Sequence, residues 1–331
     1  MKFDIIIIGG GVSSYWFLFL LSKVARKRLN IIWLKAENYI HPVNSGIIPI
    51  LTLNGIKKGN SELGDLLYDS FMHVQKYAKN MEGFYSCSQY CLLSDLDKEN
   101  EKFLRRHGCI DWLDNVFKGY QGKKLNSYIV MPQRWFNFIE RQIEESKLLK
   151  VQLLDDLVIE ATDKDNCFQI KTIGGNCFEG ESLFEFCGIG SKFLPLSFLE
   201  MTKIYRNKVS EGIVFKGSLE LGKEPFIVTQ DKCNLIYNGT GKFQLGGVNP
   251  HDKENEFLDI INAKLNLDLT KIDLMRLEGK RDKGKKRLPL EHMLIRKTGV
   301  YYKLHGLYKN AWTIAPFKID KFLRENQRFF E

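Results

Sequence analysis

The sequence has few prolines, few cysteines and no long uninterrupted hydrophobic run. Eight prolines in 331 residues, together with 27% charged residues, exclude a collagen-like, low-complexity or disordered chain. The seven cysteines are odd in number and scattered, in a chain too long to need a disulfide framework, so we expect a reducing, cytoplasmic location. Cys87 and Cys91 are four residues apart, but no second close Cys/His pair follows, and the sequence predicts no metal site.

The hydrophobic N-terminus is interrupted where a membrane helix would be continuous. Phe3 to Leu21 is rich in apolar residues, but Gly9, Gly10 and Gly11 divide it. A membrane-spanning helix needs about 20 continuous apolar residues, and a signal peptide needs a basic start and a small-residue cleavage site. We therefore expect a strand, a turn and a buried helix, and no stable membrane insertion.

Length and charge set further limits. A chain of 331 residues exceeds the roughly 250–300 residues that one hydrophobic core serves, so two domains are expected. Lys and Arg number 49 against 40 Asp and Glu, a net charge of +9. This excess favours an anionic partner, which on charge alone could be a nucleic acid, an acidic protein, a membrane face or a small carboxylate.

The first 35 residues have the pattern of a dinucleotide-binding unit. Residues 4–8 form an apolar run without alternation, typical of a central parallel strand, and a helix over 15–29 and a strand over 30–34 follow the glycines. Gly9 would permit the tight turn, and Gly11 would let the backbone approach a pyrophosphate at the helix N-terminus, near Val12 and Ser13. Ser14 replaces the usual third glycine, and being small it should still let the helix lie close to the strand.

The residue that would bind the ribose is ambiguous. Nucleotide folds of this type carry an acidic residue at the end of the second strand, where this sequence has Lys35, followed by Ala36 and Glu37. Glu37 could reach the ribose, or Lys35 could meet a phosphate or simply be solvated. The sequence leaves these alternatives open.

Several later motifs resemble the D-amino-acid oxidase and glycine oxidase family. Ser45-Gly46-Ile47-Ile48 resembles the turn that this family lays along the flavin, although it could also be a proline-bounded surface loop. The sequence predicts a strand and helix over 127–150 and an antiparallel meander of 153–159, 168–172 and 177–181. In the family, a strand such as the one around Val158 contacts adenine, and the turn at Cys187-Gly188 follows the next strand. Nothing marks Cys187 as a covalent attachment site.

The C-terminal segment carries the longest match. Residues 277–281 resemble the family's glycine-x-arginine strand. Residues 305–316 resemble the family's C-terminal motif, which ends in alanine-proline. The resemblance implies that Arg281 holds a substrate carboxylate and that Lys309 adds positive charge near the flavin's N1–C2 edge. The basic stretch 280–287 could instead be solvated or hold a larger anion.

Two further residues are candidates for the catalytic site. The tyrosine of the family's active-site wall falls on Asn234 here, which leaves Tyr237 as the nearest phenol, in a block (203–248) that alternates as in an exposed sheet. His305 could be catalytic or a structural hydrogen-bonding residue. Together with Arg281, these are the expected catalytic candidates. The residues expected at the cofactor are Gly9, Gly11, Val12, Ser13, Ser14, Lys35, Ala36, Glu37, Ser45, Gly46, Ile47, Val158, Cys187, Gly188, Gly306, Leu307, Tyr308, Lys309, Asn310 and Ala311.

The resemblance implies an α/β fold with a Rossmann-like FAD-binding domain (1–80, 130–195 and 277–331) and an interleaved substrate domain (81–129 and 196–276) on a mostly antiparallel sheet. It implies noncovalently bound FAD and oxidation of a C–N bond in a small anionic amine by hydride transfer to the flavin. Two alternatives remain: the same fold acting on a macromolecule, either a modified tRNA nucleoside or a protein side chain, or a non-catalytic flavin-binding protein.

Overall fold

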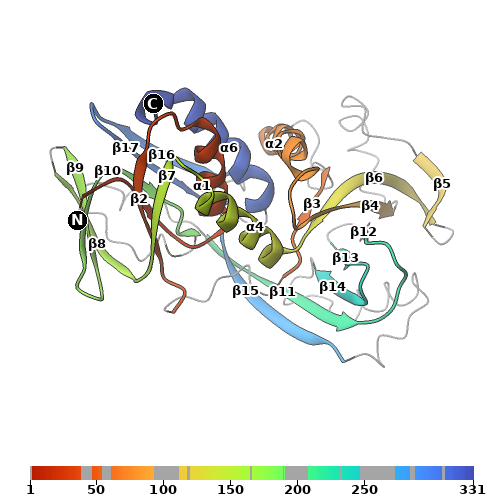
Figure 1. Ribbon diagram of the computed structural model, residues 1–331. Helices are drawn as coiled ribbons and strands as arrows, with labels where there is room; N and C mark the ends of the chain where they lie inside the picture. Colours follow the sequence, from red (N-terminus) through yellow and green to blue (C-terminus); the bar gives the residue numbers. More distant parts are fainter. Residues whose placement is uncertain are drawn as a thin grey trace. The chain divides into compact units, whose positions relative to one another are not determined.

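The computed structural model of the protein describes residues 2–38, 47–53, 61–92, 112–117, 120–164, 166–188, 190, 208–230, 233–246, 273–283, 288–307 and 310–331 (Figure 1). The chain divides into two compact units. The first contains Met1–Asn44, Phe136–Ser210 and Arg281–Glu331, and the second contains Ser45–Trp135 and Glu211–Lys280. Residues 45–80, which the sequence grouped with the expected cofactor domain, group with the second unit.

The first unit is a parallel sheet with helices and a small antiparallel meander, as the sequence predicted. Its sheet has the strand order β16-β17-β10-β1-β2-β7, with β9 pairing to β10 and β8 to β9. Pairings among β17, β10, β1, β2 and β7 are parallel, and β16 is antiparallel to β17. The elements are β1 (Lys2–Ile8), α1 (Val12–Val24), β2 (Leu29–Lys35), α4 (Pro132–Glu144), β7 (Leu149–Asp155), β8 (Val158–Lys164), β9 (Cys167–Thr172), β10 (Cys177–Glu185), β16 (Leu290–Ile295), β17 (Val300–His305), α6 (Ala311–Glu325) and a 3₁₀ turn (Gln327–Phe329).

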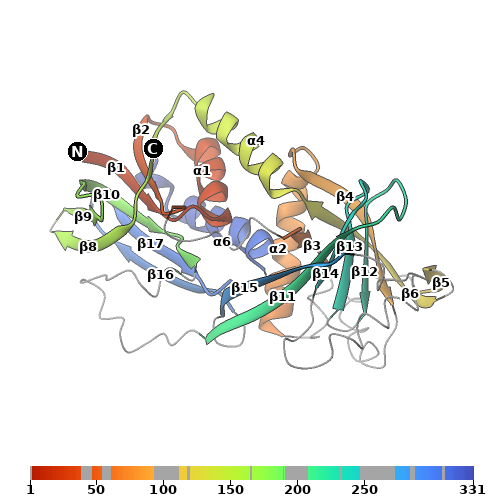
Figure 2. The same ribbon diagram turned by 90° about the horizontal axis from the view of Figure 1, so that it is seen from below.

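Strand β1 lies in the middle of this sheet because its isoleucines are buried on both faces. Ile6 and Ile8 pack with Phe168 and Ile170 of the meander, while Ile5 and Ile7, which point to the opposite face, are also buried. Helices α1 and α6 cover that opposite face (Figure 2). There, Phe184 of β10 packs against aromatic rings of both helices. The run without alternation therefore predicted correctly a strand covered on both sides.

Three predicted boundaries need correction. The first helix begins at Val12 and ends at Val24, earlier at both ends than the predicted 15–29. The predicted strand 153–159 is divided, because its first part pairs in parallel with β2 as the end of β7 and its second part begins β8. Asp156 makes the break: its Oδ1 accepts from the N–H groups of Leu157 (2.8 Å) and Gly174 (3.2 Å). The sequence predicts separate strands over 177–181 and 182–186, but residues 177–185 form the single strand β10.

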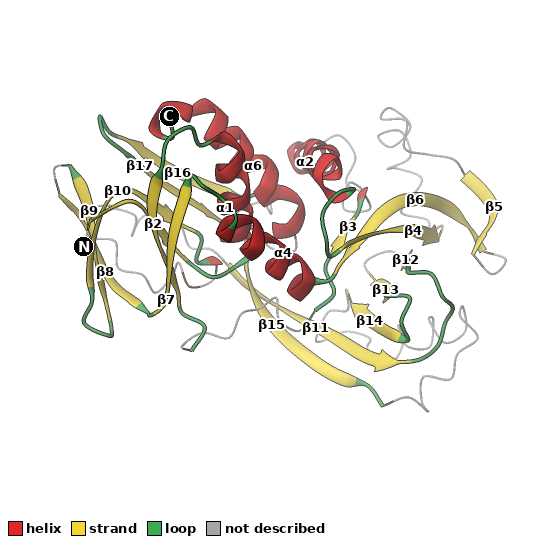
Figure 3. Ribbon diagram, viewed as in Figure 1, coloured by secondary structure: helices red, strands yellow, loops and turns green. Residues whose placement is uncertain are grey.

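The second unit is built on a sheet with the strand order β15-β11-β14-β13-β12-β4-β6-β3, to which β5 adds by pairing with β6 (Figure 3). The β12–β4 pairing is parallel, and the other pairings that the structure describes residue by residue are antiparallel. The elements are β3 (Ile50–Leu51), α2 (Glu62–Ala78), β4 (Phe84–Leu92), β5 (Trp112–Phe117), β6 (Tyr120–Val130), β11 (Lys208–Ser218), β12 (Phe226–Gln230), β13 (Cys233–Tyr237), β14 (Lys242–Gly246) and β15 (Met275–Lys283).

Residues on both faces of this second sheet are buried. The prediction that 203–248 forms strands is correct, and the prediction that the sheet is exposed is therefore wrong. Leu235 and Leu245 belong to one apolar cluster, and Ile227 and Ile236 to another. The sequence also predicts a helix over 255–265, and these residues lie outside the described part of the chain. Across the part of the chain that the structure describes, no helix is both long enough and apolar enough to cross a membrane.

Candidate cofactor-binding site

Three parallel strands of the first unit end at the same edge of its sheet, and each is followed closely by a glycine with a positive φ angle. Gly9 follows β1 (φ 118°), Gly188 follows β10 (φ 54°) and Gly306 follows β17 (φ 71°). Residues other than glycine rarely adopt a positive φ angle, so these glycines let the chain turn sharply away from the sheet. Ligands of open α/β sheets bind at this carboxyl edge. The edge therefore brings together the glycine turns that the sequence singled out separately.

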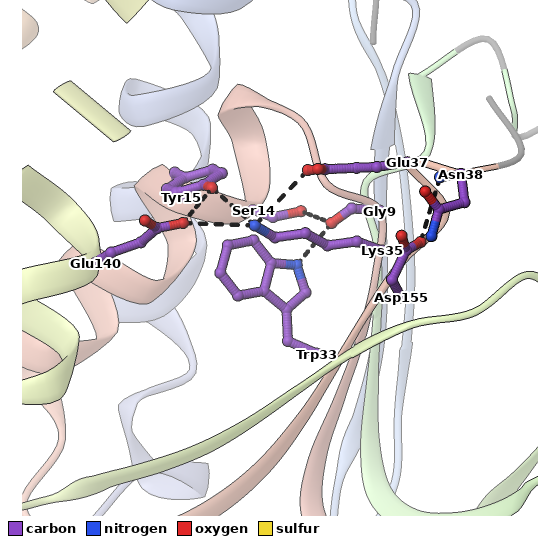
Figure 4. A network of polar contacts seen from close by, with 9 residues as sticks. All are labelled: Gly9, Ser14, Tyr15, Trp33, Lys35, Glu37, Asn38, Glu140 and Asp155. Atoms are coloured by element: carbon purple, nitrogen blue, oxygen red, sulfur yellow. Dashed lines mark hydrogen bonds and ion pairs between the residues drawn. The ribbon is translucent and has the colours of Figure 1, made fainter. Parts of the chain in front are cut away.

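The first turn is tightly fixed around Gly9. A Cβ atom at Gly9 would lie 2.6 Å from the carbonyl oxygen of Phe186, so only glycine fits. The Gly9 carbonyl accepts two side-chain hydrogen bonds, from Ser14 Oγ (2.6 Å) and Trp33 Nε1 (2.7 Å) (Figure 4). The serine that replaces the usual third glycine therefore stabilises the turn through its hydroxyl, which the sequence analysis did not foresee.

Gly11 provides the approach for a ligand. A Cβ atom there would meet nothing within 4 Å, and Gly11 is the N-cap of α1, with no side-chain cap bond. The first N–H groups of a helix lack intrahelical partners, so the amides near Val12 and Ser13 are suited to bind an anion. Open space in front of a helix N-terminus fits the pyrophosphate of a dinucleotide.

Lys35, the last residue of β2, is buried in a polar network and not solvated (Figure 4). Its Nζ donates to Tyr15 Oη (2.8 Å) and forms ion pairs with Glu140 (3.5 Å) and Glu37 (3.7 Å). The ammonium also lies 4.2 Å from the centre of the Trp33 ring. The alternative of a solvated lysine is therefore wrong, since its apolar stem and its charge both have partners within the protein.

The remaining turns supply small or polar groups at the same edge. Cys187 Sγ donates to the Ile8 carbonyl (3.5 Å), and burial raises the pKa of this thiol well above its ordinary value, which disfavours a reactive thiolate. Val158 begins β8 and packs beneath the meander. Asn310 is the N-cap of α6, and its N–H donates to the Leu307 carbonyl (2.9 Å), so Gly306, Leu307 and Ala311 form the turn into this helix.

A histidine pair lies at the end of β17. The rings of His305 and His292 are 5.5 Å apart and tilted by 35°. Burial lowers the pKa of His292 to about 4, and the positive charges of His305 and Lys303 add to that effect. The position of His305 as the last residue of β17 is compatible with either of the roles that the sequence left open.

Other predicted residues fall elsewhere. Tyr237 lies in an apolar cluster of the second unit, where its hydroxyl donates to the Gly222 carbonyl (2.7 Å) and accepts from Gly241 N–H (3.2 Å). These contacts give the phenol a structural role and lend no support to a catalytic one. Ile47 also belongs to the second unit, and Arg281 lies on β15 with its side chain outside the described part. Ser45, Gly46, Tyr308 and Lys309 lie outside the described residues as well.

Sequence reasoning missed the partners of Lys35. Tyr15 Oη donates to Glu140 Oε1 (2.7 Å), although the two residues are 125 positions apart in the chain. No local pattern indicates such a pairing, because α4 reaches the end of β2 only in the folded unit.

Comparison with known proteins identifies the fold. Neither a scan against protein-family models nor a search of curated proteins found a match. Among solved structures, glycine oxidase from Geobacillus kaustophilus superposes with a TM-score of 0.75 at 14% identity, over 99% of this chain and 95% of that one. L-proline dehydrogenase from P. horikoshii (TM-score 0.72, 14% identity, 98% and 94% covered) and FAD-bound L-α-glycerophosphate oxidase from Mycoplasma pneumoniae (0.74, 13%, 98% and 94%) are also similar. The chain has the fold of these oxidoreductases, which confirms the expected fold class.

Proposed function

We propose that this protein is an FAD-dependent oxidoreductase that oxidises a C–N bond of an amine or amino-acid-like substrate. The observation that carries the proposal is the first turn: Gly9 is restricted by the Phe186 carbonyl, whereas the space in front of Gly11 is open at the N-terminus of α1. A pyrophosphate is suited to this arrangement, because the backbone at Gly11 is open to an anion and the first amides of the helix can bind it. The likeness of the whole chain to glycine oxidase and L-proline dehydrogenase supports the same conclusion.

The protein's own groups would hold the cofactor noncovalently. The amides at the start of α1 would bind the phosphates, Glu37 would accept from the ribose, and the backbone at Val158 would contact adenine. The turns at Cys187 and Gly306 and the start of α6 at Asn310 would meet the rest of the molecule. FAD bound in this way would supply the hydride acceptor, and hydride transfer from a neutral amine requires no dedicated acid or base of the chain.

The substrate would be held as an anion. Arg281 is our candidate for binding its carboxylate, because a planar, permanently charged guanidinium makes two parallel hydrogen bonds to that group. What the protein must add is orientation of the substrate and exclusion of water. A small anionic amine is the substrate class that fits this role.

The absorbance spectrum of the purified protein tests the cofactor. We expect a yellow protein that releases FAD rather than FMN on denaturation, since FMN lacks the pyrophosphate for which Gly11 leaves space. Colourless protein that takes up no added FAD would contradict the proposal.

A second experiment tests the reaction. The yellow protein is mixed anaerobically with glycine, proline, other amino acids, iminodiacetate and α-glycerophosphate, and bleaching of the flavin absorbance is recorded. Reduction by an amine or amino acid is the expected outcome. Reduction by α-glycerophosphate alone would replace C–N oxidation with C–O oxidation, and no reduction by a wide panel would favour a macromolecular substrate or a non-catalytic role.

We also propose that the protein works in the cytoplasm. The five cysteines whose side chains the structure describes, Cys87, Cys91, Cys167, Cys177 and Cys187, carry free thiols, which is typical of a reducing compartment. Titration of the denatured protein without reductant should find all seven thiols. Finding only one would imply three disulfides and a different compartment.

A further inference from the structure

We propose that Lys35 is a positioning residue of the cofactor site, which holds Glu37 beside the glycine turn so that this carboxylate, and not the lysine, meets the ribose of the nucleotide. The proposal rests on the proposed function, because it assigns a role toward bound FAD. It also makes a claim about specificity: the site should accept a ribose with free hydroxyls and reject one that carries a 2′-phosphate.

The first argument is that Lys35 has no capacity left for a phosphate. Its side chain is only 8% exposed, and its ammonium donates to Tyr15 while two carboxylates lie within 4 Å. The faces of Trp33 and Tyr15 cover it at 4.2 and 4.9 Å from the ring centres. A phosphate could reach this nitrogen only by displacing groups that already compensate its charge.

The direction of the hydrogen bonds fixes the ammonium in place. Burial raises the pKa of Tyr15 far above its ordinary value, and its bond to Glu140 adds to the effect, so the phenol stays protonated. Tyr15 therefore donates to Glu140 (2.7 Å) and accepts from Lys35 (2.8 Å). The chain from Lys35 through Tyr15 to Glu140 holds the ammonium at one position, since Tyr15 itself packs against Trp33 and Phe136.

Glu37 is the group that faces the ligand side. Its side chain is 51% exposed, and Oε1 lies 3.4 Å from the place that a Cβ atom at Gly10 would occupy. The carboxylate is therefore next to the turn in which Gly11 is open. In folds of this type the ribose carboxylate ends the second strand, and here it stands two residues further along the chain and is held back by Lys35.

The net charge of Lys35, Glu37 and Glu140 predicts which ribose the site accepts. One ammonium with two carboxylates leaves an excess of one negative charge beside the ribose position. Carboxylate oxygens only accept hydrogen bonds, so they favour the donating hydroxyls of ribose. A 2′-phosphate would bring further negative charge close to Glu37 and Glu140, which is unfavourable in a partly buried site.

The first test is a double-mutant cycle on FAD affinity, measured with full-length apoprotein. Lys35→Met keeps the apolar stem and removes the charge, and Glu37→Gln keeps the shape of the carboxylate. We expect each to weaken FAD binding about tenfold, the size of a charge-assisted hydrogen bond, and the double variant to be no weaker than either single one. Lys150→Met on β7 and Glu144→Gln on α4, both exposed, are the matched controls and should change nothing.

The second test measures ribose recognition by competition against FAD. In the unchanged protein, ADP should compete better than 2′-deoxy-ADP, and adenosine 2′,5′-bisphosphate should compete worst. Lys35→Met and Glu37→Gln should both lose the preference for ADP over 2′-deoxy-ADP, which a purely structural role of Lys35 would leave intact. Glu140→Gln, at a half-exposed position that tolerates the change, should keep that preference but lose part of the discrimination against the 2′-phosphate.

Three results would overturn the proposal. One is additive losses of FAD affinity in the cycle, which would mean that Lys35 and Glu37 act independently. Another is unchanged ribose preference in a folded Lys35→Met protein. The last is tighter binding of the 2′-phosphate by the unchanged protein, which would make Lys35 a phosphate ligand. Failure of the unchanged protein to bind FAD at all would instead contradict the proposed function.

Discussion

Glu185 and Lys303 form an ion pair of 2.7 Å between neighbouring parallel strands, with side chains that are 0% and 3% exposed. Tyr301 donates to the other oxygen of Glu185 (3.0 Å), and burial raises the pKa of this tyrosine far above its ordinary value, so the donor keeps its proton. Removing two charges from water is costly, and only a complete set of partners offsets that cost. The pair joins the ends of β10 and β17, from which two of the glycine turns leave.

Removing one partner of this pair should therefore destabilise the fold strongly. We expect Lys303→Met to lower the free energy of unfolding by about 3–5 kcal/mol, because Glu185 is left charged and buried. The double variant Lys303→Met with Glu185→Leu should recover most of the loss. Urea denaturation measures both, and a double variant as unstable as the single one would show that packing, and not the unpaired charge, is responsible.

The two glycines of the first turn should respond to substitution in opposite ways. Gly9→Ala should destabilise the fold by about 1–3 kcal/mol from backbone strain alone, with the Phe186 carbonyl adding to it. Gly11→Asp should leave the free energy of unfolding unchanged or raise it by a few tenths of a kcal/mol, since Gly11 is an N-cap and aspartate is slightly more favourable there than glycine. The same change should abolish FAD binding, because it places a negative charge where phosphates approach.

Thermal unfolding with and without FAD separates these effects, and Gly11→Ala is the control for the charge. If Gly11→Asp still binds FAD, the pyrophosphate does not lie at this turn.

The stability of the protein should fall as the pH decreases from about 6.5 to about 4. Burial, with the charges of His305 and Lys303, lowers the pKa of His292 to about 4, whereas an unfolded histidine has a pKa near 6.5. In this range the unfolded chain binds a proton that the folded protein does not, so acid favours unfolding. Urea midpoints across this range should show the slope, and His292→Gln should reduce it. An equal slope in the variant would assign the acid sensitivity to other groups.

Replacing Arg281 tests the placement of the substrate. Arg281→Ala should leave FAD binding intact and raise KM, or weaken flavin reduction, by about 30-fold to about 1000-fold, which corresponds to about 2–4 kcal/mol for a bidentate charged contact. Lys283→Ala and Lys286→Ala should have little effect if the substrate is small. Comparable losses in all three variants that fade with added salt would favour tRNA or a protein as substrate.

The local parts of the fold could be predicted from sequence because they depend on neighbouring residues. An isoleucine run, three glycines and an apolar helix specify β1, the turn and α1 without reference to the rest of the chain. The division of 153–159 could not be predicted, because it depends on parallel pairing of β7 with β2 and on Asp156 binding the backbone of Gly174. Strand patterns alone do not contain these distant contacts.

In the candidate site too, features that depend on neighbouring residues could be predicted, and features that depend on distant contacts could not. The turn at Gly9 could be predicted because glycine itself is the signal, whereas the turns at Gly188 and Gly306 were expected only because their segments resemble those of a known family. The environment of Lys35 was not, since Tyr15 and Glu140 reach it from two different helices. In the sequence, a lysine in place of an acidic residue suggests that the site binds a phosphate instead of a ribose. In the folded unit, however, the carboxylates of Glu37 and Glu140 compensate the charge of this lysine.

The division of each unit into separated segments has a consequence for synthesis on the ribosome. Arg281–Glu331 is made after every other segment of the two units, and it supplies β17, which pairs with β10, and α6, whose Phe322 packs on Phe184. All of the second unit has been translated by then, while residues 183–185 of β10 still lack the partner strand β17 and Phe184 lacks the ring of Phe322. A chain truncated before Gly306 would lack α6 and, with it, the last glycine turn of the candidate site. Strand β10 therefore gains its complete surroundings only after the whole second unit has been made.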